Sequence, residues 1–130
     1  MRRQVVWLIA PMLALVLSPR DSGGQEKSEG KKLYLTYCSG CHGESGKGNG
    51  PAAKALPAKP ANHTDGAVMN QLSDKYLFDI ITKGGASAKK SPVMPAWGNL
   101  KEKQVREIIY HIRSLASPAK NRVPETKIGP

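Results

Sequence analysis

The five residues Cys38-Ser39-Gly40-Cys41-His42 place two thiols and one imidazole within little more than a turn of chain. At this spacing both thiols can bond to the two vinyl-derived carbons on one edge of a haem, and the pattern is typical of c-type haem attachment. The next residue, His42, is carried under the macrocycle, where its imidazole can ligate the iron. The motif therefore predicts one haem c, with Cys38 and Cys41 as covalent thioether links and His42 as an axial ligand.

Other uses of the same residues fit less well. A disulfide or a surface dithiol would make the neighbouring His42 incidental. A thioredoxin-like redox pair would follow a strand in a βαβ unit, whereas a helical pattern precedes Cys38 here. A zinc site would need two further ligands at finger-like spacing, yet His63 and His111 lie 21 and 69 residues beyond His42.

A six-coordinate haem needs a second axial ligand. The candidates downstream of the motif are Met69, Met94, His63 and His111. Met94 lies between Pro92 and Pro95, whose fixed φ angles stiffen the loop and can hold a weak thioether ligand in place. Met69 directly precedes a predicted helix, where core packing explains it, and His63 lies in a polar segment where solvation explains it. We predict Met94 as the second ligand.

The elements that must position these residues are helices and loops. Ser28 is a plausible N-cap for a first helix, with Leu33, Tyr34 and Tyr37 on one face, that runs to about residue 40. Residues 43–62 are rich in glycine and proline and predict a long loop, which needs something to wrap around.

Two further helices are expected. Ser73 is the predicted cap of one helix, which Gly84 and Gly85 end through a left-handed conformation. The last helix has apolar residues at i, i+3, i+4, i+7 and i+10 from Val105, and its cap is either Asn99 or Lys101. With no convincing alternating strands, the fold class is all-α, with three to four short helices.

The protein-only core is expected to be small. Aromatic residues make up 5% of the 130 positions, with a single Phe. The expected apolar positions are Leu33, Tyr34, Leu56, Leu77, Ile80, Val93, Ile108 and Ile112. A buried macrocycle would supply the missing apolar surface, so folding and haem attachment should be coupled.

The first 24 residues look like a targeting segment. Arg2 and Arg3 precede an uncharged, largely apolar run over residues 5–17, as in a secretory signal peptide. As a helix this run would span roughly 20 Å, short of the roughly 30 Å hydrocarbon layer. The predicted organisation is a leader or uncleaved anchor over 1–24, a domain over 25–118 and a flexible tail over 119–130. Export to the periplasm follows, with membrane association through 1–24 as the alternative.

The charge balance is basic, with 20 Lys plus Arg against 10 Asp plus Glu, and residues 25–130 keep a net charge of +8. Export and the absence of a recognition helix argue against a nucleic-acid partner. Such a balance also suits an acidic protein partner. In the order of the sequence, Lys47, Lys54, Lys89 and Lys90 fall in loops predicted to flank the haem edge, where they could steer that partner.

Residues 27 to 116 resemble a small monohaem class I cytochrome c. The resemblance rests on Gly30-x-x-Leu33-Tyr34, the haem motif followed by Gly43, Gly48-Asn49-Gly50-Pro51, Met94-Pro95 and a last helix ending Ile112-Arg113-Ser114-Leu115. It implies the cytochrome c fold, with helices and long loops wrapped around one haem. It also implies that Gly30 lets the first and last helices cross at close range.

The resemblance further implies that the Pro51 carbonyl accepts a hydrogen bond from the His42 imidazole, which would fix the ring. Family members usually have an aromatic residue where this chain has His111. We expect His111 to pack at the edge of the helix interface. Trp97 either covers the haem edge, the role we favour, or donates its indole N–H to a propionate.

The expected function is one-electron transfer with His/Met ligation and without bond-making catalysis, because both axial positions are filled. The main expectation is a monomeric shuttle between redox proteins. The alternative is a haem-bearing subunit or anchored domain of a larger dehydrogenase or oxidase complex. A five-coordinate, peroxidase-type enzyme would require that Met94 not ligate the iron.

Overall fold

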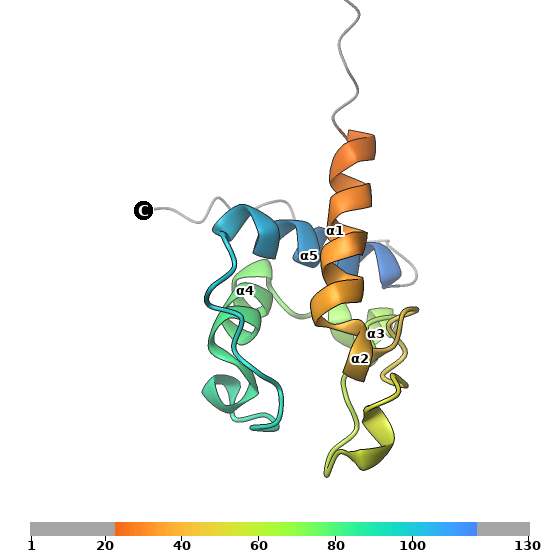
Figure 1. Ribbon diagram of the computed structural model, residues 1–130, viewed down its shortest axis with the longest axis vertical. Coiled ribbons are helices and arrows are strands. Elements are labelled where there is room, and N and C mark those ends of the chain that lie inside the picture. The colour runs from red at the N-terminus through yellow and green to blue at the C-terminus, as the bar shows by residue number, and fades with distance from the viewer. Residues whose placement is uncertain (1–22, 117–130) are drawn as a thin grey trace, which may run out of the picture.

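The computed structural model describes residues 23–116, and this part of the chain is helical and has no β-strand (Figure 1). Its α-helices are α1 (Gly23–Tyr37), α2 (Ser39–His42), α3 (Gly66–Met69), α4 (Asp74–Lys83) and α5 (Glu102–Leu115), with 3-10 turns at Ala53–Ala55 and Gly85–Ala88. The all-α prediction is confirmed. Residues 1–22 and 117–130, which carry most of the expected leader and the expected tail, lie outside the described range.

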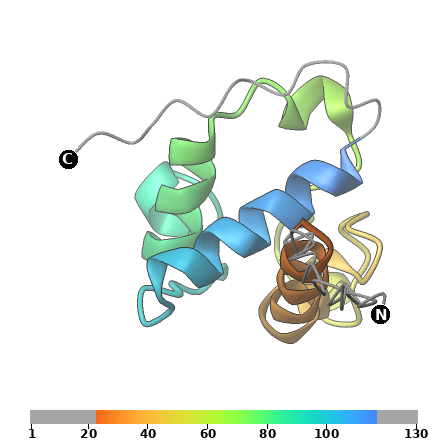
Figure 2. The same ribbon diagram turned by 90° about the horizontal axis from the view of Figure 1, so that it is seen from above.

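The frame of the domain is the crossing of α1 and α5, which run in different directions and touch near their middles (Figures 1 and 2). The inner face of α5 is an apolar stripe at helical spacing, and its four residues are at most 5% exposed: Val105, Ile108, Ile109 and Ile112. Leu33 and Tyr34 on α1 join the same core. The predicted last helix is thus confirmed, with its buried face toward α1.

Gly30 is the point of closest approach between the two helices. A Cβ atom built on Gly30 would overlap the Glu107 carbonyl oxygen and lie 3.3 Å from the Cβ of His111. Since a carbonyl on the α5 backbone cannot give way as a flexible side chain does, α1 needs a residue without a side chain here. The expected role of Gly30 is confirmed.

Replacing Gly30 with alanine is expected to destabilise the domain by about 1–3 kcal/mol, because the methyl group forces the helices apart, although alanine favours a helix by up to about 1 kcal/mol. Urea unfolding of the matured protein measures the change. Lys32→Ala, an exposed position on the same helix, is the control and should be near neutral. A stable Gly30→Ala protein would show that the helices do not meet at this residue.

The ends of α4 are set by residues next to it in the sequence, with Ser73 at its start and Gly84 at its end. The Ser73 hydroxyl oxygen accepts a hydrogen bond from the Tyr76 N–H at 3.1 Å, so the predicted cap is confirmed. Asp79 pairs with Lys75 and Lys83 one turn away on either side, and these hydrogen bonds lower the pKa of its carboxyl to about 2. Gly84 ends the helix with φ +80° and ψ 169°, a positive φ but not the expected left-handed helical conformation.

Arg113 ties α5 to the segment that joins α3 and α4. Its guanidinium donates to the Asp74 carboxylate at 2.7 Å and to the Met69 carbonyl at 2.5 Å, and also donates to the Leu72 carbonyl. The guanidinium is planar and has several N–H donors, so it can bind these three oxygen atoms at once. The interaction fixes the wall of the domain that carries Met69 and Leu72.

Two features of the helices differ from the sequence-based expectation, and the start of α5 falls on one of its two expected caps. Ser28 lies inside α1, which begins at Gly23, so it is not an N-cap. The short helix α3 was not expected, and its N-cap is Asp65, whose carboxylate accepts from Ala67 N–H at 3.0 Å. For α5 the cap is Lys101, whose N–H donates to the Gln104 side chain at 3.0 Å.

Among residues 23–116, no helix has the length and apolar character to cross a membrane.

Candidate functional site

The main feature of the described residues is a partly open cavity of about 630 Å³, whose lining includes Ile112 of α5. In Figure 1, α4 lies on one side below α5, and α2 with the loop that follows it lies on the other. The cavity is lined by the donors predicted from the sequence, Cys38, Cys41, His42 and Met94, together with apolar side chains of α4. Residues more than 50 positions apart in the chain therefore converge on one space.

The haem motif forms a helical turn at the end of α1. The Cys38 N–H donates to the Tyr34 carbonyl at 2.8 Å and the His42 N–H donates to the Cys38 carbonyl at 2.9 Å, so the helical hydrogen bonding passes through the motif. Gly43, with φ +79°, then turns the chain away. Both thiols consequently reach the same wall of the cavity.

Burial protects the Cys38 thiol from ionisation. Desolvation, and secondarily the neighbouring Cys41, raises the pKa of Cys38 to about 12. Reactive dithiols of the thioredoxin type need a lowered thiol pKa. The electrostatics of this turn therefore disfavour a redox dithiol and leave haem attachment as the better use of the pair.

The His42 ring is oriented by a backbone carbonyl. Its Nδ1–H donates to the Ala61 carbonyl at 3.0 Å, which leaves the Nε2 lone pair available to bind a metal ion. Burial lowers the pKa of His42 and so favours the neutral imidazole, the form that binds metals, although the bond to Ala61 acts in the opposite direction.

The carbonyl that orients His42 was expected to be that of Pro51, and this prediction is wrong. Gly50 N–H donates to the Cys41 carbonyl and Ala52 N–H to the Gly40 carbonyl, both at 3.0 Å. These bonds hold Pro51 against the backbone of the motif turn, with its side chain exposed. The chain then loops out and returns at Ala61, whose carbonyl faces the imidazole.

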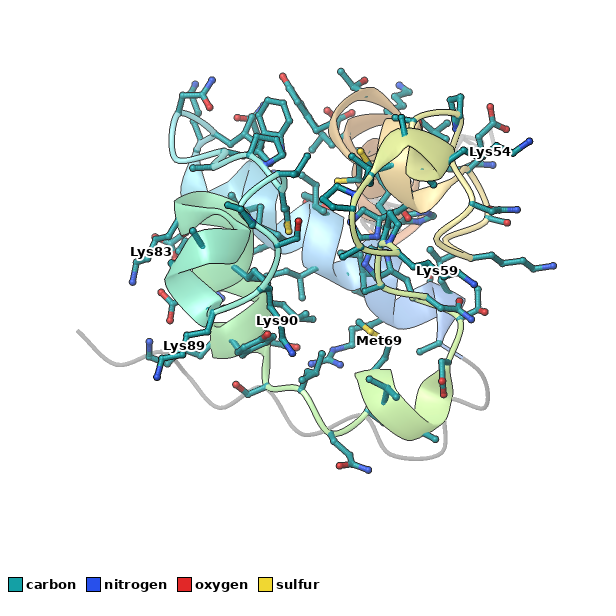
Figure 3. The ribbon with its side chains drawn as sticks, turned by 90° about the horizontal axis from the view of Figure 1, so that it is seen from below. Lys54, Lys59, Met69, Lys83, Lys89 and Lys90 are labelled. Carbon is teal, nitrogen blue, oxygen red and sulfur yellow. The ribbon has the colours of Figure 1, made fainter. Side chains whose placement is uncertain are left out.

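Two methionines line the cavity. Met94 is partly buried, and its loop is held because Gly85 N–H donates to the Met94 carbonyl at 3.1 Å. Met69 is 2% exposed and belongs to the hydrophobic core (Figure 3). The burial of Met69 fits the packing role expected for it, and Met94 stays the predicted ligand.

The Met94 loop continues into Trp97, which also lines the cavity. The Trp97 ring lies against Tyr37 with ring centroids 4.9 Å apart, and its backbone N–H donates to the Ile81 carbonyl at 2.8 Å. This position suits the role of covering the cavity. Val93, expected in the core, is instead 45% exposed, because it lies where this loop rims the cavity.

The donor set fits a haem. Two thiols three residues apart, a neutral imidazole with a free Nε2 and a thioether on a braced loop line one largely apolar cavity, whose volume lies within the range of about 300–1,000 Å³ usual for small-molecule sites. Two cysteines that form thioether bonds, a histidine and a methionine are also the side chains that hold c-type haem.

Comparison with known proteins decides the family. Residues 25–112 match the family described as cytochrome C oxidase, cbb3-type, subunit III. The chain belongs to this family. The cytochrome c fold expected from the sequence is confirmed, and the class I monohaem resemblance is consistent with the match.

Similar proteins include two cbb3-type cytochrome c oxidase subunits named FixP. The subunit of Bradyrhizobium diazoefficiens is 30% identical over 93 residues, which are 71% of this chain and 28% of that protein. The subunit of Azorhizobium caulinodans is 30% identical over 99 residues, 75% of this chain and 29% of that protein. The chain thus spans less than a third of the length of these curated relatives.

A solved structure supports the fold. The reducing HAO-like protein complex of Kuenenia stuttgartiensis contains a chain that superposes with a TM-score of 0.60 at 26% identity. The match covers 78% of this chain and 47% of that chain. The same helical frame therefore serves within a larger assembly in that organism.

Sequence reasoning missed one residue of this cytochrome c site. His63 was expected in solvent, but it is 7% exposed and its ring stacks on His42 with centroids 4.2 Å apart and planes 16° apart. The polar neighbours Asn62, Thr64 and Asp65 hid this burial, since their side chains bond within the turn and toward α3.

His111 lies at the helix crossing, as expected from its place in the cytochrome c domain. Its ring is 5.0 Å from that of Tyr34, and its buried Nε2 has no hydrogen-bond partner among the described residues. Burial, and secondarily Lys31, lowers the pKa of His111 from 6.5. The crossing thus favours the neutral imidazole.

Stability should depend on pH through His111. Its folded pKa lies below 6.5, so as the pH falls below that value the unfolded chain binds the proton first and stability is lost. The loss is at most about 1.4 kcal/mol per pH unit for one proton, and less here because the residue is only partly buried. Urea unfolding at pH 7.5 and pH 5 measures it. His111→Phe should shrink the difference; an unchanged difference would assign the pH dependence to other groups.

Proposed function

We propose that this domain carries one covalently bound haem c and transfers single electrons within a larger respiratory complex. The observation that carries the proposal is the convergence of Cys38, Cys41, His42 and Met94 on one cavity. A haem held there would supply an iron that cycles between ferric and ferrous states. Membership of an oxidase-subunit family supports the assignment.

Each side chain has a separate task in this proposal. Cys38 and Cys41 fix the haem to the turn at the end of α1, His42 ligates through Nε2, and the braced loop presents the Met94 sulfur. Held by His42 and Met94, the haem iron would favour the ferrous state relative to ligation by two imidazoles. With no open position for a substrate, the domain conducts electrons and does not catalyse a bond-making step. Trp97 shields the haem edge from water.

The comparisons favour a subunit of a complex over the free monomeric shuttle that was the main expectation from the sequence. The FixP relatives are named as oxidase subunits and the structural neighbour is part of a protein complex. An exported, periplasmic domain, held at the membrane by residues 1–24 or by its partners, is consistent with this assignment.

The test is a redox titration of the matured protein combined with gentle solubilisation of the host membranes. We expect a single one-electron transition of a low-spin haem that does not bind carbon monoxide, and elution with larger redox proteins. Carbon monoxide binding would favour the five-coordinate enzyme. Elution as a free monomer would favour the shuttle.

Lysines lie at and near the cavity and suit an acidic redox partner. Lys59 and Lys90 contribute to its lining, and Figure 3 shows Lys54 and Lys59 on one side of the molecule and Lys89 and Lys90 on the other. Lys54, Lys89 and Lys90 were expected at the haem edge. Lys59 was not expected there, and Lys47, also expected at the haem edge, is exposed, as are Lys54 and Lys89, but none of these three lines the cavity. We propose that this group steers the partner toward the haem edge.

Reversing the charges of Lys89 and Lys90 to glutamate is expected to slow association with an acidic electron-transfer protein by about tenfold at low salt, and to weaken the salt dependence. Stopped-flow electron exchange at two ionic strengths measures both quantities. The control is Lys31→Glu with Lys32→Glu on α1, which changes the net charge equally away from the cavity. Equal effects of the two pairs would show that net charge alone matters.

A further inference from the structure

Three aromatic rings, of which Tyr34 and His63 are buried, form a row behind the proposed iron ligand. His63 stacks on His42, with centroids 4.2 Å apart. The Tyr34 hydroxyl lies 3.0 Å from His63 Nδ1, and the Tyr34 ring contacts His111 at 5.0 Å. The row joins the iron ligand to the crossing of α1 and α5.

The direction of the Tyr34–His63 hydrogen bond follows from burial. Tyr34 is fully buried, and desolvation raises the pKa of its phenol far above 10, so the hydroxyl keeps its proton. Among the described residues, His63 Nδ1 is the partner found for this hydroxyl. A buried O–H needs an acceptor, so Tyr34 donates and His63 Nδ1 accepts. The bond fixes the tautomer of His63 and the rotation of its ring.

The backbone holds His63 just as firmly. Its N–H donates to the Gly46 carbonyl at 2.7 Å. Gly46 itself fits tightly, because a Cβ there would lie 3.2 Å from the Cβ of His63 and 2.8 Å from a methyl carbon of Leu115. The same short segment also supplies the Ala61 carbonyl to His42 Nδ1. Residues 61 and 63 thus contact the His42 ring at its edge and on its face.

We propose that His63, held by Tyr34, is a positioning residue that sets the plane of the His42 imidazole. The proposal rests on the proposed function, since that plane matters only with iron bound. A carbonyl on Nδ1 fixes one atom of the ring but leaves rotation about the hydrogen bond, and a parallel ring restrains that rotation. Burying an imidazole where an apolar side chain would pack costs desolvation energy, which a packing role alone does not explain.

The test uses the haem-loaded protein and the variants His63→Phe, Tyr34→Phe and both together. His63→Phe keeps a flat ring but removes the acceptor, while Tyr34→Phe removes one hydroxyl. Proton NMR of the ferric protein reports the ligand plane through the spread of the haem methyl shifts. The midpoint potential is the second readout. Tyr110→Phe, a hydroxyl deletion on α5 outside the row, is the matched control.

We expect both single variants to change the order or spread of the methyl shifts and to change the ferrous-to-ferric ratio at a fixed potential by up to about tenfold, equivalent to about 59 mV. Because Tyr34 acts through His63, the hydroxyl deletion should add nothing in the His63→Phe background. Tyr110→Phe should match the parent protein.

Methyl shifts that stay as in the parent protein in both single variants would overturn the proposal. So would a full effect of Tyr34→Phe when His63 is already phenylalanine. If His63→Phe does not take up haem, Tyr34→Phe decides alone, since altered shifts support the proposal and unaltered shifts refute it. A parent protein without covalent haem would instead refute the proposed function.

Discussion

Replacing both thiols, Cys38→Ala with Cys41→Ala, is expected to give a chain without covalent haem that has lost most of its helical signal. The cavity of about 630 Å³ takes up the centre of a small domain, and its apolar walls from α4 and the Met94 loop would face water without a haem. Folded domains are stable by only about 5–15 kcal/mol, so the free-energy cost of exposing these apolar walls to water is enough to unfold this one. Far-UV circular dichroism and pigment content measure the outcome.

The matched control is Ser39→Ala, which alters the motif between the two cysteines. The Ser39 hydroxyl donates to the Leu35 carbonyl at 2.6 Å and does not bear on attachment, so haem and helices should both persist. A native-like helical spectrum from the double cysteine variant would show that the protein core suffices without the haem.

Replacing Met94 with alanine is expected to abolish the charge-transfer band that a methionine sulfur gives at the red end of the ferric spectrum, and to lower the midpoint potential. The reason is that loss of the thioether removes the ligand that favours ferrous iron. The fold should survive, because Met94 is only partly buried on a loop anchored by Gly85. Visible spectroscopy and redox titration give the two readouts.

Met69→Ala is the matched control, since it deletes the same side chain from another wall of the cavity. Met69 is 2% exposed, so its loss should cost about 2–5 kcal/mol of stability while the band remains. If the band disappears with Met69 and persists without Met94, the second ligand has been assigned to the wrong methionine.

Local patterns in the sequence predicted the helices that carry their own signals. The apolar stripe from Val105 specifies the buried face of α5, and Ser73 specifies the start of α4, because stripes and caps depend on neighbours within a turn or two. Gly30 was identified through the family resemblance, and its contact with the Glu107 carbonyl gives the physical reason.

The site depends on a loop whose path cannot be predicted from local patterns. Residues 43–62 form long-range bonds, such as His63 N–H to the Gly46 carbonyl and Ala52 N–H to the Gly40 carbonyl. These bonds decide that Ala61 rather than Pro51 faces His42, and that His63 is buried. A polar sequence around His63 predicts exposure, and the tertiary fold overrides it.

The most direct test of the covalent haem is the intact mass of the matured protein, recorded with its visible spectrum. We predict a polypeptide heavier by one haem, coloured, and without free thiols at Cys38 and Cys41. The same mass also reports where the mature chain begins. A colourless protein with the mass of the bare polypeptide and two free thiols would contradict the account.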